Sequence, residues 1–268
     1  MKKRLFLALV FGVFLLFSCN KNEKSQVSQP EIYEEYEPVY VSGIINPGYV
    51  LRVNSGLLAI DDDTGEETNK TRWVESMALG ETILTGETRR ATFSSDGVVY
   101  DFIEIKRENG KEGYAFAMQV AVGGQLAVVI DEKANLYRSP KVVDVSGTIL
   151  SRRTVVVYYP ETENGGFVEV RAYDPERQAY IRTDNNYVRY TSISRKESDV
   201  QSAILLQTAL PLRESNSAEK TRRDALLESA LQLYPDSEFY AEIHELVNPD
   251  TAGIFPREVF ETHEFFEE

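Results

Sequence analysis

Between Tyr40 and about Ser194, apolar and polar residues alternate in short runs separated by turn residues, a pattern typical of β-strands. Residues 98–106 are rich in β-branched and aromatic side chains, and Asn109-Gly110 follows them as a tight-turn signal, which makes 112–117 the return strand. Residues 154–159 and 167–173 flank a second turn, and 178–182 is a further short strand. This part of the chain is therefore predicted to be all-β.

After Lys196 the apolar residues fall at helical spacing. Pro211 ends the first expected helix, Asn216 followed by Glu219 provides an N-cap for a second, and Pro235 separates the second from a third. We expect residues 195–249 to form a helical extension packed on the β-region, and 250–268 an acidic tail. Leu231 to Pro235 also resembles the end of a tetratricopeptide unit, which leaves a partner-binding role for the helices open.

The first 18 residues have the pattern of an export signal. Three basic residues at positions 2–4 precede an apolar run, residues 5–17, that is too short for an ordinary membrane-spanning helix. Leu16-Phe17-Ser18-Cys19 resembles the bacterial lipobox, with Phe17 departing from its usual small or aliphatic residue. We expect cleavage before Cys19, which is the only cysteine of the chain, and attachment of lipid to it. Residues 19–39 would then form a polar tether. A plain secretory signal and an uncleaved anchor are the alternatives.

The charge balance narrows the class of partner. The chain carries a formal charge of −14, and removal of the three basic residues in 1–18 leaves the mature part at −17. Such a chain is repelled by nucleic acid and by anionic lipid headgroups. We therefore expect basic or neutral partners and no nucleic acid.

Two strand segments repeat each other. Phe102 to Lys106 and Phe167 to Arg171 match residue class by residue class at a spacing of 65 positions. Their alternation puts the β-branched residues on one face and the charged pair on the other. We expect the β-branched residues to be buried: Ile103, Ile105, Val168 and Val170. Each segment is followed by a turn and a short strand with a tyrosine, so Tyr114 is predicted to be the counterpart of Tyr180.

The sequence also resembles a known family. Asn135-Leu136-Tyr137-Arg138-Ser139-Pro140 is similar to the opening motif of bacterial SH3-like domains, and Leu51-Arg52-Val53-Asn54-Ser55-Gly56 fits an earlier copy. Tyrosine stands where the family has a closing tryptophan in both copies. The resemblance implies two tandem small SH3-like barrels, 40–122 and 123–194, so that the predicted fold class is mainly β with a C-terminal α-helical extension. In exported bacterial proteins it implies contact with cell-wall peptides or partner proteins.

Few residues point to catalysis, and we assign no catalytic residue, metal or cofactor. The histidines, His244 and His263, lack a paired metal spacing, and no serine sits in a nucleophile elbow. The acidic segment from Asp61 to Glu67 does not match a calcium-binding loop, and we interpret it as a solvated hairpin tip. A carboxylate pair of the kind used in glycoside hydrolysis stays open, because the sequence does not show which acids approach one another.

The tyrosines of the second expected barrel are the remaining functional signal. Tyr137, Tyr180 and Tyr187 are the candidate ligand-binding residues, since flat rings at an SH3-like surface stack on extended peptides. Tyr137 adjoins an inward leucine, so alternation predicts an outward ring. The leading hypothesis is a lipid-anchored envelope protein, more consistent with the outer membrane, that binds peptidoglycan peptide or an envelope protein without catalysis. The alternatives are an envelope hydrolase with a carboxylate-based site and an outward-facing ligand binder.

Overall fold

A computed structural model describes residues 46–61, 70–174, 179–181 and 186–249 of the chain. The predicted signal peptide, Cys19, the tether, the acidic tail and His263 lie outside these residues, as does nearly all of the acidic hairpin tip. No helix among the described residues is long and apolar enough to cross a membrane.

The first half of the described chain forms one seven-stranded sheet, in the order β3-β2-β6-β5-β4-β1-β7. Its pairings are antiparallel, apart from a parallel bridge that joins Lys70 to Thr92. Ile103 and Ile105 are buried together in its core, as their alternation predicted. The strands are β1 (Asn46–Val50), β2 (Ser55–Asp61), β3 (Lys70–Met77), β4 (Thr82–Thr92), β5 (Val99–Arg107), β6 (Glu112–Phe116) and β7 (Val120–Val122).

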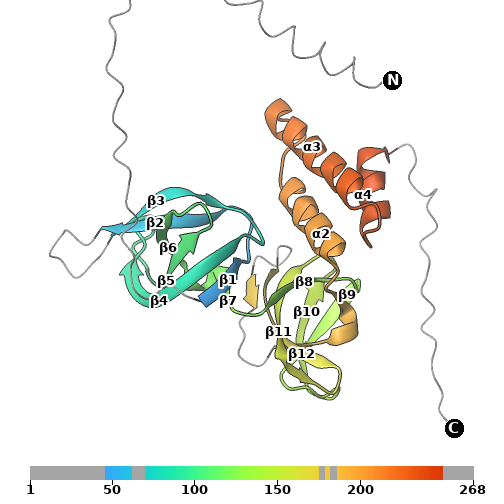
Figure 1. Ribbon diagram of the computed structural model, residues 1–268, viewed down its shortest axis with the longest axis horizontal. Helices are drawn as coiled ribbons and strands as arrows, with labels where there is room; N and C mark the ends of the chain where they lie inside the picture. The colour runs from blue at the N-terminus through green and yellow to red at the C-terminus, as the bar shows by residue number, and fades with distance from the viewer. Residues whose placement is uncertain (1–45, 62–69, 175–178, 182–185, 250–268) are drawn as a thin grey trace, which may run out of the picture. The chain divides into compact units, whose positions relative to one another are not determined.

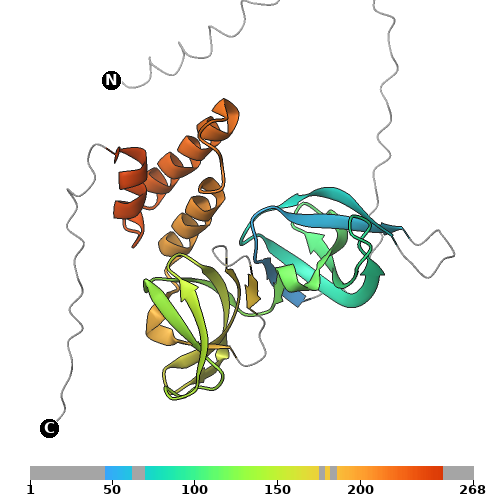
Figure 2. The same ribbon diagram turned by 180° about the vertical axis from the view of Figure 1, so that it is seen from behind.

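The second half forms a separate antiparallel sheet, in the order β10-β9-β14-β12-β11-β8-β15, with β13 paired to β12. Val168 and Val170 are fully buried in its core, again as predicted. The strands of both sheets bend sharply (Figures 1 and 2). They are β8 (Gln125–Val129), β9 (Lys133–Tyr137), β10 (Val145–Ser151), β11 (Val155–Asn164), β12 (Phe167–Asp174), β13 (Ala179–Ile181), β14 (Tyr187–Arg189) and β15 (Ile193–Ser194).

The two sheets have the same strand order once β13 is set aside. A 3-10 turn also lies at the same place in each, η1 (Ala117–Gln119) before β7 and η2 (Tyr190–Ser192) before β15. The duplication read from the sequence is therefore present at the level of topology. It makes each strand of the first sheet the counterpart of one strand in the second.

The strand registers correct one predicted match. Tyr114 of β6 lies opposite Glu104. In the second sheet β14 takes the place of β6, and its residue opposite Glu169 is Tyr187. Tyr180 instead lies on the added strand β13, opposite Tyr173. The sequence pattern failed here because a strand and two connections are inserted before the true counterpart of β6.

The registers also correct the first copy of the opening motif. Leu58 pairs with Tyr114 just as Tyr137 pairs with Tyr187, so Leu57 is the counterpart of Leu136. Leu51, the residue aligned with Leu136 from the sequence, lies before β2 instead. The error arose because residues 51–54, which resemble the start of the short motif, form the turn that precedes β2.

Three helices follow the second sheet: α2 (Glu197–Ala209), α3 (Ser217–Leu233) and α4 (Tyr240–Val247). The expected fold class of mainly β structure with helices at the C-terminal side is thus confirmed. Asn216 caps α3, because its side-chain oxygen accepts the backbone N–H groups of Ala218 at 3.0 Å and Glu219 at 3.3 Å. These two bonds satisfy N–H groups that have no partner within the helix.

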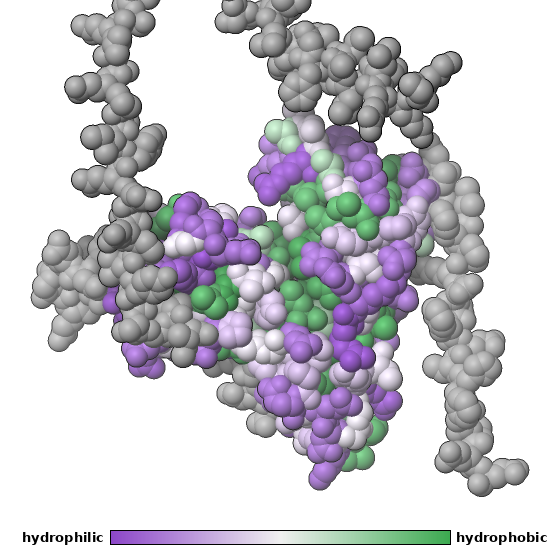
Figure 3. Space-filling model, viewed as in Figure 1, coloured by the Kyte–Doolittle hydropathy of each residue, from purple (hydrophilic) through white to green (hydrophobic). Residues whose placement is uncertain are grey.

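The helices pack on the second sheet through apolar and polar contacts. Val128 of β8 and Val155 of β11 share a core cluster with Leu206 of α2 and Phe239. Gln207 interrupts the apolar stripe of α2 because its side-chain amide donates to the backbone carbonyl of Arg153. Figure 3 shows apolar side chains gathered around α2 and α3, whereas the second sheet presents mostly hydrophilic ones in this view.

Candidate functional site

Of the three candidate tyrosines, Tyr137 is buried. The residue is 4% exposed, and its ring packs edge-on against Phe167 with the centroids 4.9 Å apart. The prediction that strand alternation turns this ring outward is therefore wrong. A ring enclosed in this way offers no flat face to a ligand.

The duplication explains why Tyr137 is enclosed. Its counterpart Leu58 and the counterpart of Phe167, Phe102, are both fully buried in a second small core of the first sheet. That core lies on the opposite side of β5 from Ile103. The two-residue period tells which residues share a face, but here both faces are covered.

Tyr180 and Tyr187 are half-buried and have different neighbours. Tyr187 lies between Tyr137 and Glu169 across neighbouring strands. The ring of Tyr180 packs on Tyr173 at a centroid distance of 4.6 Å. Burial raises the pKa of Tyr180, while nearby Arg52 acts in the opposite direction. The structure thus brings Tyr137 and Tyr187 together but places Tyr180 in another cluster.

A pocket of about 310 Å³ lies along the hairpin formed by β11 and β12. It combines an aromatic ring, two carboxylates, a guanidinium and an apolar wall. Sequence analysis did not assign Tyr159 or the other lining residues to a site. The pocket is lined by Val122, Tyr159, Glu161, Thr162, Glu169 and Arg171.

A bulge in β11 shapes this pocket. The pairing of β11 with β12 shifts register between Tyr159 and Asn164. Thr162 holds the bulge, because its hydroxyl donates to the Tyr159 carbonyl oxygen at 2.7 Å and accepts the Glu169 backbone N–H at 2.9 Å. Bulges re-aim side chains near functional sites, and Pro160 within a strand pattern is a sequence signal from which a bulge could have been predicted.

Charges of both signs meet in the pocket. One guanidinium nitrogen of Arg171, Nη2, donates to the backbone carbonyl of Ala117 at 2.7 Å, which fixes the side chain in the pocket wall. Burial raises the pKa of the Tyr159 hydroxyl, an effect that Arg171 opposes and Glu169 reinforces. Tyr159 is therefore a neutral hydroxyl at physiological pH.

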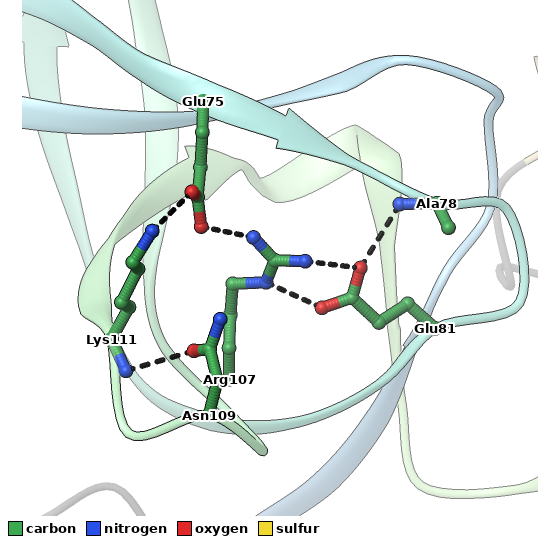
Figure 4. Close-up of polar contacts among 6 residues, drawn as sticks. All are labelled: Glu75, Ala78, Glu81, Arg107, Asn109 and Lys111. Carbon is green, nitrogen blue, oxygen red and sulfur yellow. Dashed lines mark hydrogen bonds and ion pairs between the residues drawn. The ribbon is translucent and has the colours of Figure 1, made fainter. Parts of the chain in front are cut away.

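A charged cluster in the first sheet surrounds Arg107 (Figure 4). The Arg107 guanidinium binds Glu81 through two bonds, at 2.5 and 2.9 Å, and also contacts Glu75. Lys111 binds the other oxygen of Glu75 at 2.5 Å, and Glu81 also accepts the Ala78 backbone N–H at 3.0 Å. The hydrogen bonding of Arg107 to the Glu81 carboxylate raises the pKa of Arg107.

This cluster has a structural role. It joins the end of β3 and the turn before β4 to the hairpin between β5 and β6. An open pocket of about 430 Å³ beside it is lined by Glu81, Arg107, Glu108 and Asn109. Because Arg107 is already held by two carboxylates, its charge is balanced within the protein. Sequence analysis did not find the cluster, since its members are separated in the chain.

Metal-ligating side chains do not gather in the part of the chain that the structure describes: no group of three or more His, Cys, Asp or Glu there has the arrangement of a metal site. His244 lies on α4, where its ring is 6.1 Å from the ring of Tyr240 and its neighbour Asn248 approaches Nε2 at 3.4 Å.

Comparison with known proteins assigns no family. No protein-family model and no curated protein matches the chain. A solved structure of NlpC2 from Trichomonas vaginalis is matched with 9% sequence identity and a TM-score of 0.19, over 62% of this chain and 56% of that one. The chain thus spans little more than half the length of that protein, and the low score carries no conclusion about fold or function.

Proposed function

We propose that this protein is a lipid-anchored bacterial envelope protein whose two SH3-like barrels form a non-enzymatic binding or scaffolding module. Its partners are cell-wall peptides or other envelope proteins. The observation that carries the proposal is the repeated strand order of the two sheets, each with a 3-10 turn before its last strand. Tandem copies of a small β-unit are suited to presenting several binding surfaces to an extended partner.

The anchoring part of the proposal rests on the sequence. The basic start, the short apolar run and the lipobox-like end at Cys19 agree with an exported lipoprotein. A polar tether over 19–39 separates the folded part from the membrane. The strongly acidic mature chain favours basic or neutral partners over anionic lipid.

Co-sedimentation tests the proposal. The soluble mature chain with Cys19→Ala is mixed with purified cell-wall fragments and, separately, with vesicles that carry envelope proteins. Saturable retention on either material, reversed by excess unlabelled chain, is the expected result. If the folded chain stays in the supernatant with both materials, the binding function is contradicted.

A further inference from the structure

The tripeptide Glu-Asn-Gly occurs at the tips of two hairpins, one in each sheet. The first copy, residues 108–110, joins β5 to β6, and the second, residues 163–165, ends β11 and begins the turn to β12. In both copies the asparagine and the glycine are exposed. An asparagine followed by glycine is prone to react with the backbone, because glycine has no side chain to hinder the approach. The two hairpins therefore carry the same local chemistry in different surroundings.

Hydrogen bonds hold both reactive groups of the first copy. The Gly110 backbone N–H donates to the carbonyl oxygen of Arg107 at 2.9 Å. The side-chain oxygen of Asn109 accepts the Lys111 backbone N–H at 3.1 Å. The backbone nitrogen and the side-chain amide are thus each bound to another residue, and both bonds must open before the two groups can meet.

The second copy lacks both of these bonds. Asn164 lies opposite Phe167 at the end of the strand pair, so Gly165 and Gly166 form a two-residue turn, with φ of 58° and 79°. Among the described residues, the Gly165 N–H donates to no acceptor, and the Asn164 side chain makes no hydrogen bond. The two groups that react are therefore both available in the folded hairpin.

We propose that Asn164 is a site of spontaneous deamidation in the folded protein, and that the first hairpin protects Asn109 from the same reaction. The inference goes beyond the proposed binding function and does not rest on it. It assigns a covalent change that alters the surface of the second sheet with time.

The reaction needs only solvent as co-reactant. The Gly165 backbone nitrogen loses its proton to a solvent base and bonds to the side-chain amide carbon of Asn164, whose nitrogen takes up a proton and leaves as ammonia. Water then adds to either carbonyl carbon of the cyclic imide and breaks its bond to nitrogen, which gives aspartate or isoaspartate. Either product adds a negative charge to the hairpin tip, and isoaspartate also lengthens the backbone there by one carbon.

Peptide mapping by mass spectrometry tests this inference on the full mature chain carrying Cys19→Ala. The folded chain is incubated at mildly alkaline pH in water labelled with heavy oxygen, so that each deamidated peptide carries the label. We expect Asn109 to react at least about tenfold more slowly than Asn164, because its two hydrogen bonds must open first. The same chain unfolded in urea is the control. There the two identical tripeptides should react at similar rates.

A pair of variants assigns the new charge to one hairpin. Asn164→Gln lengthens the side chain by a methylene, which disfavours closure of the imide ring, and should remove the earliest acidic species that isoelectric focusing detects in the aged, folded chain. Asn109→Gln makes the same change in the protected hairpin and should leave that species in place. Thermal unfolding of both variants checks that they are folded.

Three outcomes would overturn the inference. The first is reaction of Asn109 in the folded chain at the rate of Asn164 or faster. The second is the absence of labelled product at Asn164 over a time in which the unfolded chain reacts. The third is a difference between the two sites that persists in urea, since the hairpin structure would then not be its cause.

Discussion

Tyr187 lies directly opposite Glu169 across strands β14 and β12. The first sheet repeats this arrangement, with Tyr114 opposite Glu104. The repeated tyrosine–glutamate pairs fix how the two copies correspond, although the residues between the matched strands differ in number. They also show that Tyr180, which took this place in the sequence alignment, belongs to an added strand.

We predict that Tyr137→Ala destabilises the protein rather than removing a ligand contact. Its ring is buried against Phe167, and truncating a buried aromatic side chain costs about 3–5 kcal/mol. Urea unfolding measures this free-energy loss. Tyr187→Ala, at a half-buried ring, should cost less; a larger loss for Tyr187 than for Tyr137 would contradict the packing described.

We predict that buried side chains of the repeated strand, which is β5 in the first sheet and β12 in the second, stabilise the two main cores. Ile105→Ala should lower the free energy of unfolding by about 2–4 kcal/mol, since it removes buried apolar surface and leaves a cavity. Val143→Ala is the control, because Val143 is 91% exposed, and its effect should lie within about 0.5 kcal/mol. Equal effects of the two changes in urea unfolding would refute the assignment of the core.

We predict that Asp199 ties the helices to the second sheet. This buried side chain accepts a hydrogen bond from the Ser194 hydroxyl at 2.5 Å and another from the Glu238 backbone N–H at 2.9 Å. Asp199→Ala should cost about 1.5–3 kcal/mol, the usual range for a hydrogen bond to a charged group. Hydrogen exchange should show the loss of protection in α4, with the exposed Glu228→Ala as control. Unchanged protection after the Asp199 substitution would count against this tie.

We predict an acid-sensitive contribution from Glu75. The hydrogen bond from Lys111 holds the pKa of this carboxyl below its ordinary value of 4.5. Because the folded-state pKa is the lower one, the contribution to stability is complete above about pH 4.5 and is lost as the pH falls through the folded value. The drop in urea midpoint between about pH 6 and about pH 3 should be smaller in Glu75→Gln than in the parent. An identical drop in the two proteins would show that Glu75 makes no such contribution.

The parts of the fold that follow from local rules could be predicted from the sequence. Alternation identified Ile103, Ile105, Val168 and Val170 as core residues, and Asn216 capped α3 as its side chain indicated. These predictions succeeded because each depends on a few neighbouring residues. The cap needs one side-chain oxygen, and the strand face needs only the two-residue period.

The rest depends on contacts between distant segments. The burial of Tyr137 requires a second core on the far side of its strand, which no periodicity reveals. The Glu75–Arg107–Glu81 cluster joins β3 and the turn before β4 to the end of β5, and the pocket at Tyr159 lies where the pairing of β11 with β12 shifts register at Thr162. Gln207 is a polar residue in the apolar stripe of α2, and its partner, the Arg153 carbonyl, lies outside that helix and cannot be found from the helical period.

We predict that membrane attachment depends on Cys19. Cys19→Ala should release the protein from the membrane fraction and abolish its labelling by a fatty-acid probe, because no other cysteine is present. Fractionation of cells that express the parent and the variant measures both effects. Unchanged labelling of the variant would show that the lipid is carried elsewhere or that the signal is not a lipoprotein signal.

The most direct test of the proposed function measures retention and turnover in the same sample of purified cell-wall fragments and envelope vesicles. The soluble mature chain is added, and both the bound chain and the soluble products released from the fragments are followed over time. We predict saturable retention with no release of products above that of a sample without protein. A steady release of soluble fragments would instead indicate an envelope hydrolase, and absence of retention on either material would contradict a binding module.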